Sequence, residues 1–146
     1  LVALREAQAA ENPWALVNTW GELGYFEQQR SRYEASVAHF RKALERWPSI
    51  AANRPDPAFG LWLASGLALS QTMLGDQEAA QQALAEATRA ASALDASHPA
   101  RLALLRAGAR VAEQAGDYEA SVAALAEASE LARRVIGADA RQVAAI

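Results

Sequence analysis

The strongest indication of the fold is the segment Tyr33-Glu34-Ala35-Ser36-Val37-Ala38. It recurs without change as Tyr118-Glu119-Ala120-Ser121-Val122-Ala123. A related stretch, Gln77-Glu78-Ala79-Ala80-Gln81-Gln82, lies between the two copies. The equivalent positions Tyr33, Gln77 and Tyr118 are 44 and 41 residues apart. Similar segments at a regular spacing indicate an internal repeat, in which each unit is one supersecondary element stacked on the next.

Each unit is predicted to be a helical hairpin. Gly75-Asp76 and Gly116-Asp117 mark tight turns, since glycine adopts the left-handed conformation that ends a helix and aspartate caps the next one. Ser31-Arg32 takes this place in the first unit. A cap followed by proline at the first helical position marks the other helix starts, at Asn12-Pro13, Asp56-Pro57 and His98-Pro99.

These signals predict helices over residues 1–11, 13–30, 32–47, 57–74, 76–95, 99–115 and 117–136, with a further helix beginning near residue 139. The segment 48–56 is expected to be the one substantial loop. Apolar residues follow the helical period of 3.6, as in the set Val37, Phe40, Ala43, Leu44 and Trp47 and the set Val122, Leu125, Ala128 and Leu131. A single hairpin cannot bury such a stripe, so the hairpins are expected to stack into a solenoid.

The spacing of large and small residues resembles the tetratricopeptide repeat signature. The first unit carries it at Trp20, Leu23, Gly24, Tyr33, Phe40, Ala43 and Pro48, and the later units carry parts of it, including Gly75, Asp76, Gly116, Asp117 and Tyr118. The resemblance implies an all-α, right-handed superhelical solenoid of antiparallel helix hairpins, with about three full repeats plus flanking helices. The period exceeds the usual 34 residues, as in the extended repeats of kinesin-light-chain type and of bacterial regulators. A HEAT or armadillo array is the alternative fold, because a period of 41–44 residues suits it too.

The repeats divide the chain as one helical-repeat domain. Residues 1–12 are expected to be the trailing helix of a preceding repeat, and 13–56, 57–97 and 98–137 to be repeats one, two and three. Residues 138–146 are expected to begin a further repeat or to form a cap. Because both ends of the sequence fall within a repeat, we expect the chain to be cut from a longer protein. We also expect a cytoplasmic location, and end-to-end self-association through uncovered apolar faces.

Composition narrows the classes of function. The chain is 52% hydrophobic and 21% charged, and no apolar run approaches the roughly 18 residues of a membrane-spanning helix, so we expect no membrane partner. The net charge of -3 argues against nucleic acid as a partner. The absence of cysteine removes thiol nucleophiles and thiolate metal sites.

Catalytic chemistry finds no support in the residue pattern. His39 and His98 lie in different units and have no second ligand at metal-binding spacing, so we expect no metal site. The glycines are dispersed and form no phosphate-binding loop. We therefore expect neither an enzyme nor a cofactor.

A binding surface is implied on the concave wall, which the first helix of each hairpin forms in the tetratricopeptide family. Carried onto this sequence, the wall comprises Asn18, Tyr25, Gln28, Gln29, Trp62, Leu69, Met73, Arg106, Arg110 and Glu113. Trp62, Leu69 and Met73 share one helix face as apolar anchors, or alternatively pack the neighbouring repeat. Arg106 and Arg110, one turn apart, could hold a carboxylate or phosphate in a bidentate manner, or alternatively are solvated.

The expected function is therefore a protein–protein interaction scaffold that binds a peptide or protein segment in its concave groove. An acidic group on the partner would meet Arg106 and Arg110. The alternative is a sensor or regulatory segment of a larger bacterial transcription regulator or kinase, in which the array binds a small ligand or an intramolecular partner. The fold implied by the resemblance does not by itself fix the function.

Overall fold

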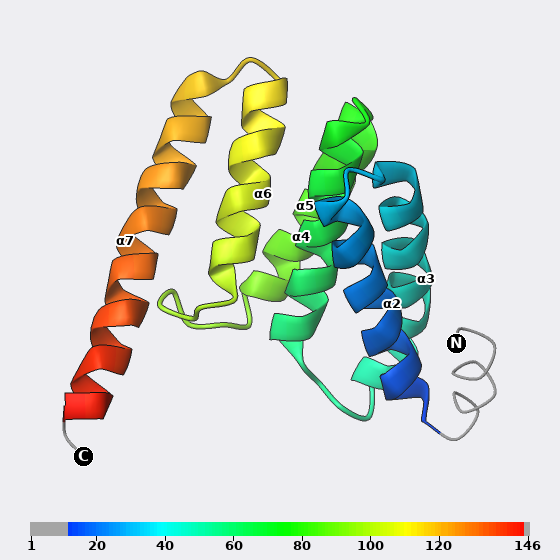
Figure 1. The fold of residues 1–146 in the computed structure, drawn as a ribbon, viewed down its shortest axis with the longest axis horizontal. Helices are drawn as coiled ribbons and strands as arrows, with labels where there is room; N and C mark the ends of the chain where they lie inside the picture. The colour runs from blue at the N-terminus through cyan, green and yellow to red at the C-terminus, as the bar shows by residue number, and fades with distance from the viewer. Residues whose placement is uncertain (1–11, 145–146) are drawn as a thin grey trace.

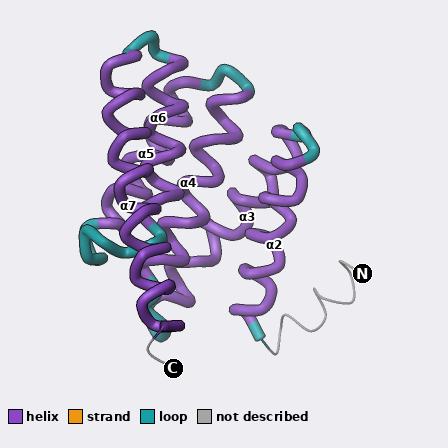
Figure 2. Tube along the Cα trace, turned by 60° about the vertical axis from the view of Figure 1, so that its left-hand side comes forward, coloured by secondary structure: helices purple, strands orange, loops and turns teal. Residues whose placement is uncertain are grey.

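The computed structural model describes the backbone of residues 12–144 and the side chains of residues 12–137. That part consists of six α-helices (Figure 1): α2 (Pro13–Gln29), α3 (Tyr33–Ala51), α4 (Pro57–Met73), α5 (Gln77–Ala91), α6 (Arg101–Gln114) and α7 (Tyr118–Ala144). No strand occurs within these limits, as Figure 2 also shows, so the prediction of an all-α fold is confirmed for the described residues. The helix expected over residues 1–11 lies outside them.

The predicted turn chemistry is confirmed at the hairpin tips. Gly75 and Gly116 both have φ of 79°, and Ser31 occupies the same left-handed region at 58°. Carboxylates cap the helices that follow the glycine turns: Asp76 Oδ1 accepts a hydrogen bond from the Ala79 amide and Asp117 Oδ1 from the Ala120 amide. Arg32, which precedes α3, makes no such cap. The first hairpin therefore keeps the turn geometry with a serine in the strained position and without the carboxylate cap.

The helices pair as antiparallel hairpins, α2 with α3, α4 with α5, and α6 with α7. The three pairs lie side by side, with α7 at one edge of the molecule and α2 and α3 at the other (Figure 1). The first helices of the hairpins also pack on one another, α2 on α4 and α4 on α6, and each second helix contacts the first helix of the next hairpin. This is the predicted solenoid of stacked hairpins, while the exact residue limits of the repeats stay predictions.

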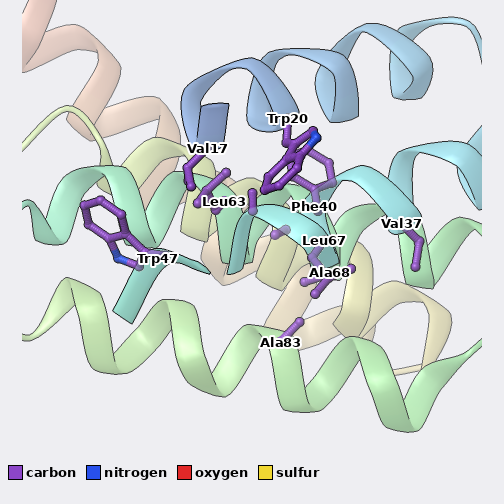
Figure 3. Packing of buried hydrophobic residues seen from close by; sticks show 11 residues of the cluster. Val17, Trp20, Val37, Phe40, Trp47, Leu63, Leu67, Ala68 and Ala83 are labelled. Carbon is purple, nitrogen blue, oxygen red and sulfur yellow. The ribbon is translucent and has the colours of Figure 1, made fainter. Parts of the chain in front are cut away.

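The core is concentrated between the first two hairpins (Figure 3). Phe40 is completely buried between Gly24 of α2 and Gly66 of α4, where an added Cβ at Gly66 would lie 2.4 Å from its ring. The two glycines therefore let α2 and α4 approach the phenyl ring closely. At the joint between α5 and α6, the Leu84 side chain lies 3.9 Å from the position of a Cβ added at Gly108.

The ends of α3 and α7 lie further along the chain than the sequence predicts. α3 does not end at Trp47 but continues through Pro48 to Ala51, because a proline near a helix end removes a single donor while its fixed φ is helical. α7 does not break at residues 136–139 but continues to Ala144. That segment contains a glycine but no proline, and a glycine inside a helix costs only about 1 kcal/mol.

The connection between the second and third hairpins is longer than expected. α5 ends at Ala91 rather than near residue 95, and α6 begins at Arg101 rather than at residue 99. The Arg101 guanidinium donates hydrogen bonds to the carbonyl oxygens of Ala91 and Leu94, at 2.8 and 3.3 Å. These bonds satisfy carbonyl groups at the end of α5 and fix the connection against α6.

Candidate functional site

Two adjoining hollows lie where the first helices of the hairpins meet. The first, of about 430 Å³, is bounded by α2, α4 and the start of α6, and its lining consists of Tyr25, Gln28, Trp62, Ser65, Gly66, Leu69, Pro99, Ala100, Leu102, Ala103, Arg106 and Ala107. The second, of about 380 Å³, is bounded by α4, α6 and α7, and is lined by Leu69, Arg106, Ala109, Arg110, Glu113, Ser121 and Leu125. Leu69 and Arg106 line both hollows, so the two meet at these side chains.

Most of the residues predicted for the concave wall come together here. Tyr25, Gln28 and Trp62 line the first hollow, Arg110 and Glu113 the second, and Leu69 and Arg106 both. Asn18, Gln29 and Met73 line neither of them. Asn18 donates a hydrogen bond to Glu22 on its own helix, Gln29 is exposed near the end of α2, and Met73 is exposed near the end of α4.

Tyr25 and Trp62 form an aromatic wall that joins the first two hairpins. Their rings stack with centroids 4.6 Å apart, and the Tyr25 hydroxyl donates a hydrogen bond of 3.0 Å to the Trp62 carbonyl oxygen. Burial raises the pKa of Tyr25 well above its ordinary value, so the phenol stays protonated and keeps donating. Trp62 therefore packs on the neighbouring repeat, which was the alternative to its role as an anchor. Its side chain also lines the first hollow.

Gln28 takes part in a buried polar network. Its Nε2 donates to the Gly66 carbonyl oxygen at 3.0 Å and to Ser70 Oγ at 2.7 Å. Ser70 Oγ lies 2.8 Å from Ser36 Oγ, which donates to the Gly24 carbonyl oxygen at 2.7 Å. The Tyr25 and Gln28 donors therefore already fix α2 to α4, and the contact between Ser36 and Ser70 fixes α3 to α4.

The arginine pair is asymmetric. Arg110 Nη1 lies 2.8 Å from Glu113 Oε2, one turn further along α6, and both side chains are about half exposed. Arg106 is exposed and, within the described residues, makes no hydrogen bond or ion pair. The Arg106 guanidinium, at the junction of the hollows, is therefore free to bind an anion. The Arg110 guanidinium would have to break its ion pair with Glu113, or share it, to do the same.

Several lining residues were missed or given no role by the sequence analysis, among them Leu102, Leu125 and Ser65. Leu102 faces the first hollow from α6, and Leu125 faces the second from α7, the second helix of its hairpin. Ser65 lines the first hollow, and its buried hydroxyl makes no hydrogen bond to the described residues. Two signals pointed to an apolar role for Leu125: its place in the helical period with Val122 and Leu131, and the recurrence of Tyr33–Ala38 as Tyr118–Ala123, which aligns it with the core residue Phe40.

Two other kinds of site are absent from the part of the chain that the structure describes. Within it, no helix is both long enough and apolar enough to cross a membrane. Nor do three or more histidine, aspartate or glutamate side chains gather there as a metal-binding group.

Comparison with known proteins adds a family assignment. The sequence model of the tetratricopeptide repeat matches residues 16–93, which is more than half of the chain and covers the first two hairpins. No curated protein and no solved structure matches the chain significantly.

Proposed function

Because the chain belongs to the tetratricopeptide repeat family, whose repeats generally mediate protein–protein interactions, we propose that it binds an extended segment of another protein along the two adjoining hollows. The segment would cross α4 and α6 near Leu69 and Arg106. It would carry an apolar side chain beside a carboxylate or another anionic group.

The observation that carries this proposal is the chemistry of the junction. Leu69 offers a half-buried apolar surface to both hollows, and the exposed Arg106 guanidinium stands beside it without an ion partner among the described residues. A guanidinium pairs with a carboxylate through two parallel hydrogen bonds, which gives direction as well as affinity. The apolar anchor supplies burial, and the arginine fixes the register of the bound segment.

The rest of the wall would act through its shape. The Tyr25 and Gln28 donors are committed to α4, so the stacked rings of Tyr25 and Trp62 would present a fixed surface rather than hydrogen bonds. A wall that is already ordered loses little conformational entropy when a partner binds. Glu113, which holds Arg110, would disfavour a second acidic group next to the first.

A second candidate function rests on the size of the hollows. Volumes of about 380 and 430 Å³ fall within the range of small-molecule sites, roughly 300–1,000 Å³. A small carboxylate held by Arg106 would fit a sensor or regulatory role for the array.

The test is a selection from a displayed library of random linear peptides, followed by fluorescence anisotropy with the enriched sequences. Arg106→Glu should weaken binding at least about tenfold, because it replaces an attractive charge by a repulsive one. Arg89→Glu is the matched control, since Arg89 is an exposed arginine on α5 and lines neither hollow. It should leave binding unchanged.

The outcomes separate the candidates. Enriched peptides that bind both variants equally well would contradict the proposed site, and a library that yields no enriched peptide would contradict peptide binding. In that second case, a thermal-shift screen of small carboxylates, with the same two variants, tests the sensor function.

A further inference from the structure

α7 carries an apolar stripe that no other described helix covers. Tyr118, Val122 and Ile136 are 68%, 66% and 68% exposed, and Leu125 is 52% exposed although it also lines the second hollow. Together with Ser129 and Ala132 they recur at alternating intervals of four and three residues. This spacing places them in one line along the helix, like the apolar residues that form the seam at which two helices of a coiled coil pack together.

The chain itself shows what covers such a stripe. The identical stretch in α3 begins the same line of residues, and there Val37 is 7% exposed and Phe40 is completely buried. The helix α4 covers them, with Gly66 against the Phe40 ring. The occupant that fits the α7 stripe is therefore another α-helix.

The charges beside the stripe favour a second α7 in the opposite direction. Glu119 follows Tyr118 near the start of the stripe, and Arg133 follows Ala132 near its end, so the two hold the same position relative to the seam. Both side chains are exposed. Antiparallel pairing of two copies brings Glu119 of each next to Arg133 of the other, whereas in parallel pairing these residues lie on opposite flanks of the seam and do not meet.

The sizes of the stripe residues also favour antiparallel pairing of two copies. Antiparallel pairing sets Val122 opposite Ala132 and Leu125 opposite Ser129, so that each larger residue meets a smaller one, and sets Tyr118 opposite Ile136. Ser129 Oγ already accepts a hydrogen bond from Arg133 Nη2 at 3.3 Å, so its hydroxyl does not enter the seam without a partner. The Arg133–Glu130 ion pair, 3.1 Å long and exposed, is cheap to exchange for one between copies.

We propose that the α7 stripe is a self-association surface on which a second copy of this chain docks its own α7 antiparallel, forming a symmetric dimer. The same residues contribute from both copies, as a two-fold axis requires. At the edge of the molecule, α7 is free to accept this partner without displacing the other hairpins (Figure 1). Leu125 belongs both to the stripe and to the second hollow, but the charges that set the direction of pairing, on Glu119 and Arg133, lie outside both hollows.

The first test is sedimentation equilibrium of the whole chain over a wide range of concentration, together with Val122→Glu and Ile136→Glu. The unsubstituted chain should reach the dimer mass, and each variant should stay monomeric because it buries a charge in the seam twice. Phe26→Glu is the control, since Phe26 is an exposed aromatic residue of α2 at the opposite edge, and it should dimerise normally. Helical content by circular dichroism should be equal in all three variants, since each of these side chains is exposed.

The second test fixes the direction of pairing. Glu119→Arg and Arg133→Glu should each weaken the dimer roughly tenfold at low salt, because each leaves like charges facing across the seam. An equal mixture of the two variants should recover the original affinity, because every Arg then faces a Glu in the mixed dimer. A mixture as weak as its components would overturn the antiparallel register, and a chain that is monomeric at every concentration would overturn the proposal.

Discussion

The same six-residue sequence begins α3 and α7, but its residues are buried to different extents in the two helices. Ser36 and Ser121, at equivalent positions, are both buried, at 0% and 7% exposure, because each faces the first helix of its own hairpin. Val37 and Val122, one position later, are 7% and 66% exposed. The local sequence therefore sets the face that meets the hairpin partner, and the neighbouring hairpin decides whether the adjacent face is buried.

The residues after the shared stretch follow the same division. Phe40 and Trp47 of α3 lie in the core, with the Trp47 ring 4.9 Å from that of Phe59 in α4. Their counterparts in α7 are Leu125 and Ala132, which are smaller and less buried. α3 has the larger side chains because a neighbouring hairpin is present to surround them.

The largest expected effect separates Phe40 from Leu125. Phe40→Ala should lower the free energy of unfolding by about 3–5 kcal/mol, because it leaves a cavity between α2 and α4. Leu125→Ala, at the equivalent position of α7, should cost less than about 1 kcal/mol. Urea unfolding, followed by circular dichroism below the concentration of self-association, measures both, and similar losses would show that the α7 face is covered within the single chain.

A sharper comparison uses the identical stretch itself. Val37→Ala should lower the free energy of unfolding by about 2 kcal/mol, since two buried methyl groups are lost and the space between α3 and α4 stays empty. Val122→Ala removes the same groups from the same six-residue context, where they face solvent, and should change stability by no more than about 0.5 kcal/mol. The difference between the two urea midpoints isolates the contribution of the neighbouring hairpin, and equal midpoints would contradict it.

The smallest expected effect concerns His39, whose counterpart in α7 is Ala124. Burial lowers the pKa of His39 below its ordinary 6.5, the nearby Lys42 ammonium lowers it further, and Glu27 opposes them in part. The unfolded chain therefore binds the proton more readily, so the stabilising contribution is present above pH 6.5 and is lost as pH falls through the folded-state pKa.

Thermal unfolding between about pH 8 and pH 5 measures this effect. The melting temperature of the unsubstituted chain should fall more over this range than that of His39→Gln, which does not titrate there. Ala124→Gln serves as the control for adding an amide at the equivalent place in α7, and it should keep the pH dependence of the unsubstituted chain. Parallel curves for all three proteins would show that His39 contributes nothing.

The site was predictable where it follows from the repeat and not where it depends on contacts. The repeat register brought Tyr25, Trp62, Leu69 and Arg106 to one wall, because equivalent positions of stacked hairpins face the same side. It gave no sign that the Tyr25 and Gln28 donors are consumed by α4, since their acceptors lie 37 and 38 residues away or more. It also included Asn18, Gln29 and Met73, which line neither hollow.

Local sequence signals are enough to predict the hairpins. The turns and caps involve only a few neighbouring residues, so residue types alone predict them. They are the left-handed turns at Gly75 and Gly116 and the caps at Asp76 and Asp117. The apolar period then required that the hairpins stack. Where helices continue past a weak stop, as α7 does at Gly137, the signal was ambiguous because glycine permits a turn without demanding one.

Which of the two identical segments packs in the core and which is exposed depends on contacts between hairpins. Burial depends on what lies across the interface, and for Val37 that is α4, a helix that begins twenty residues later in the chain. The tertiary structure decided in the same way that the Tyr25 and Gln28 donors are bonded to α4, across 37 and 38 residues of sequence. Helix formation is set by neighbours in sequence, but burial and pairing are set by neighbours in space.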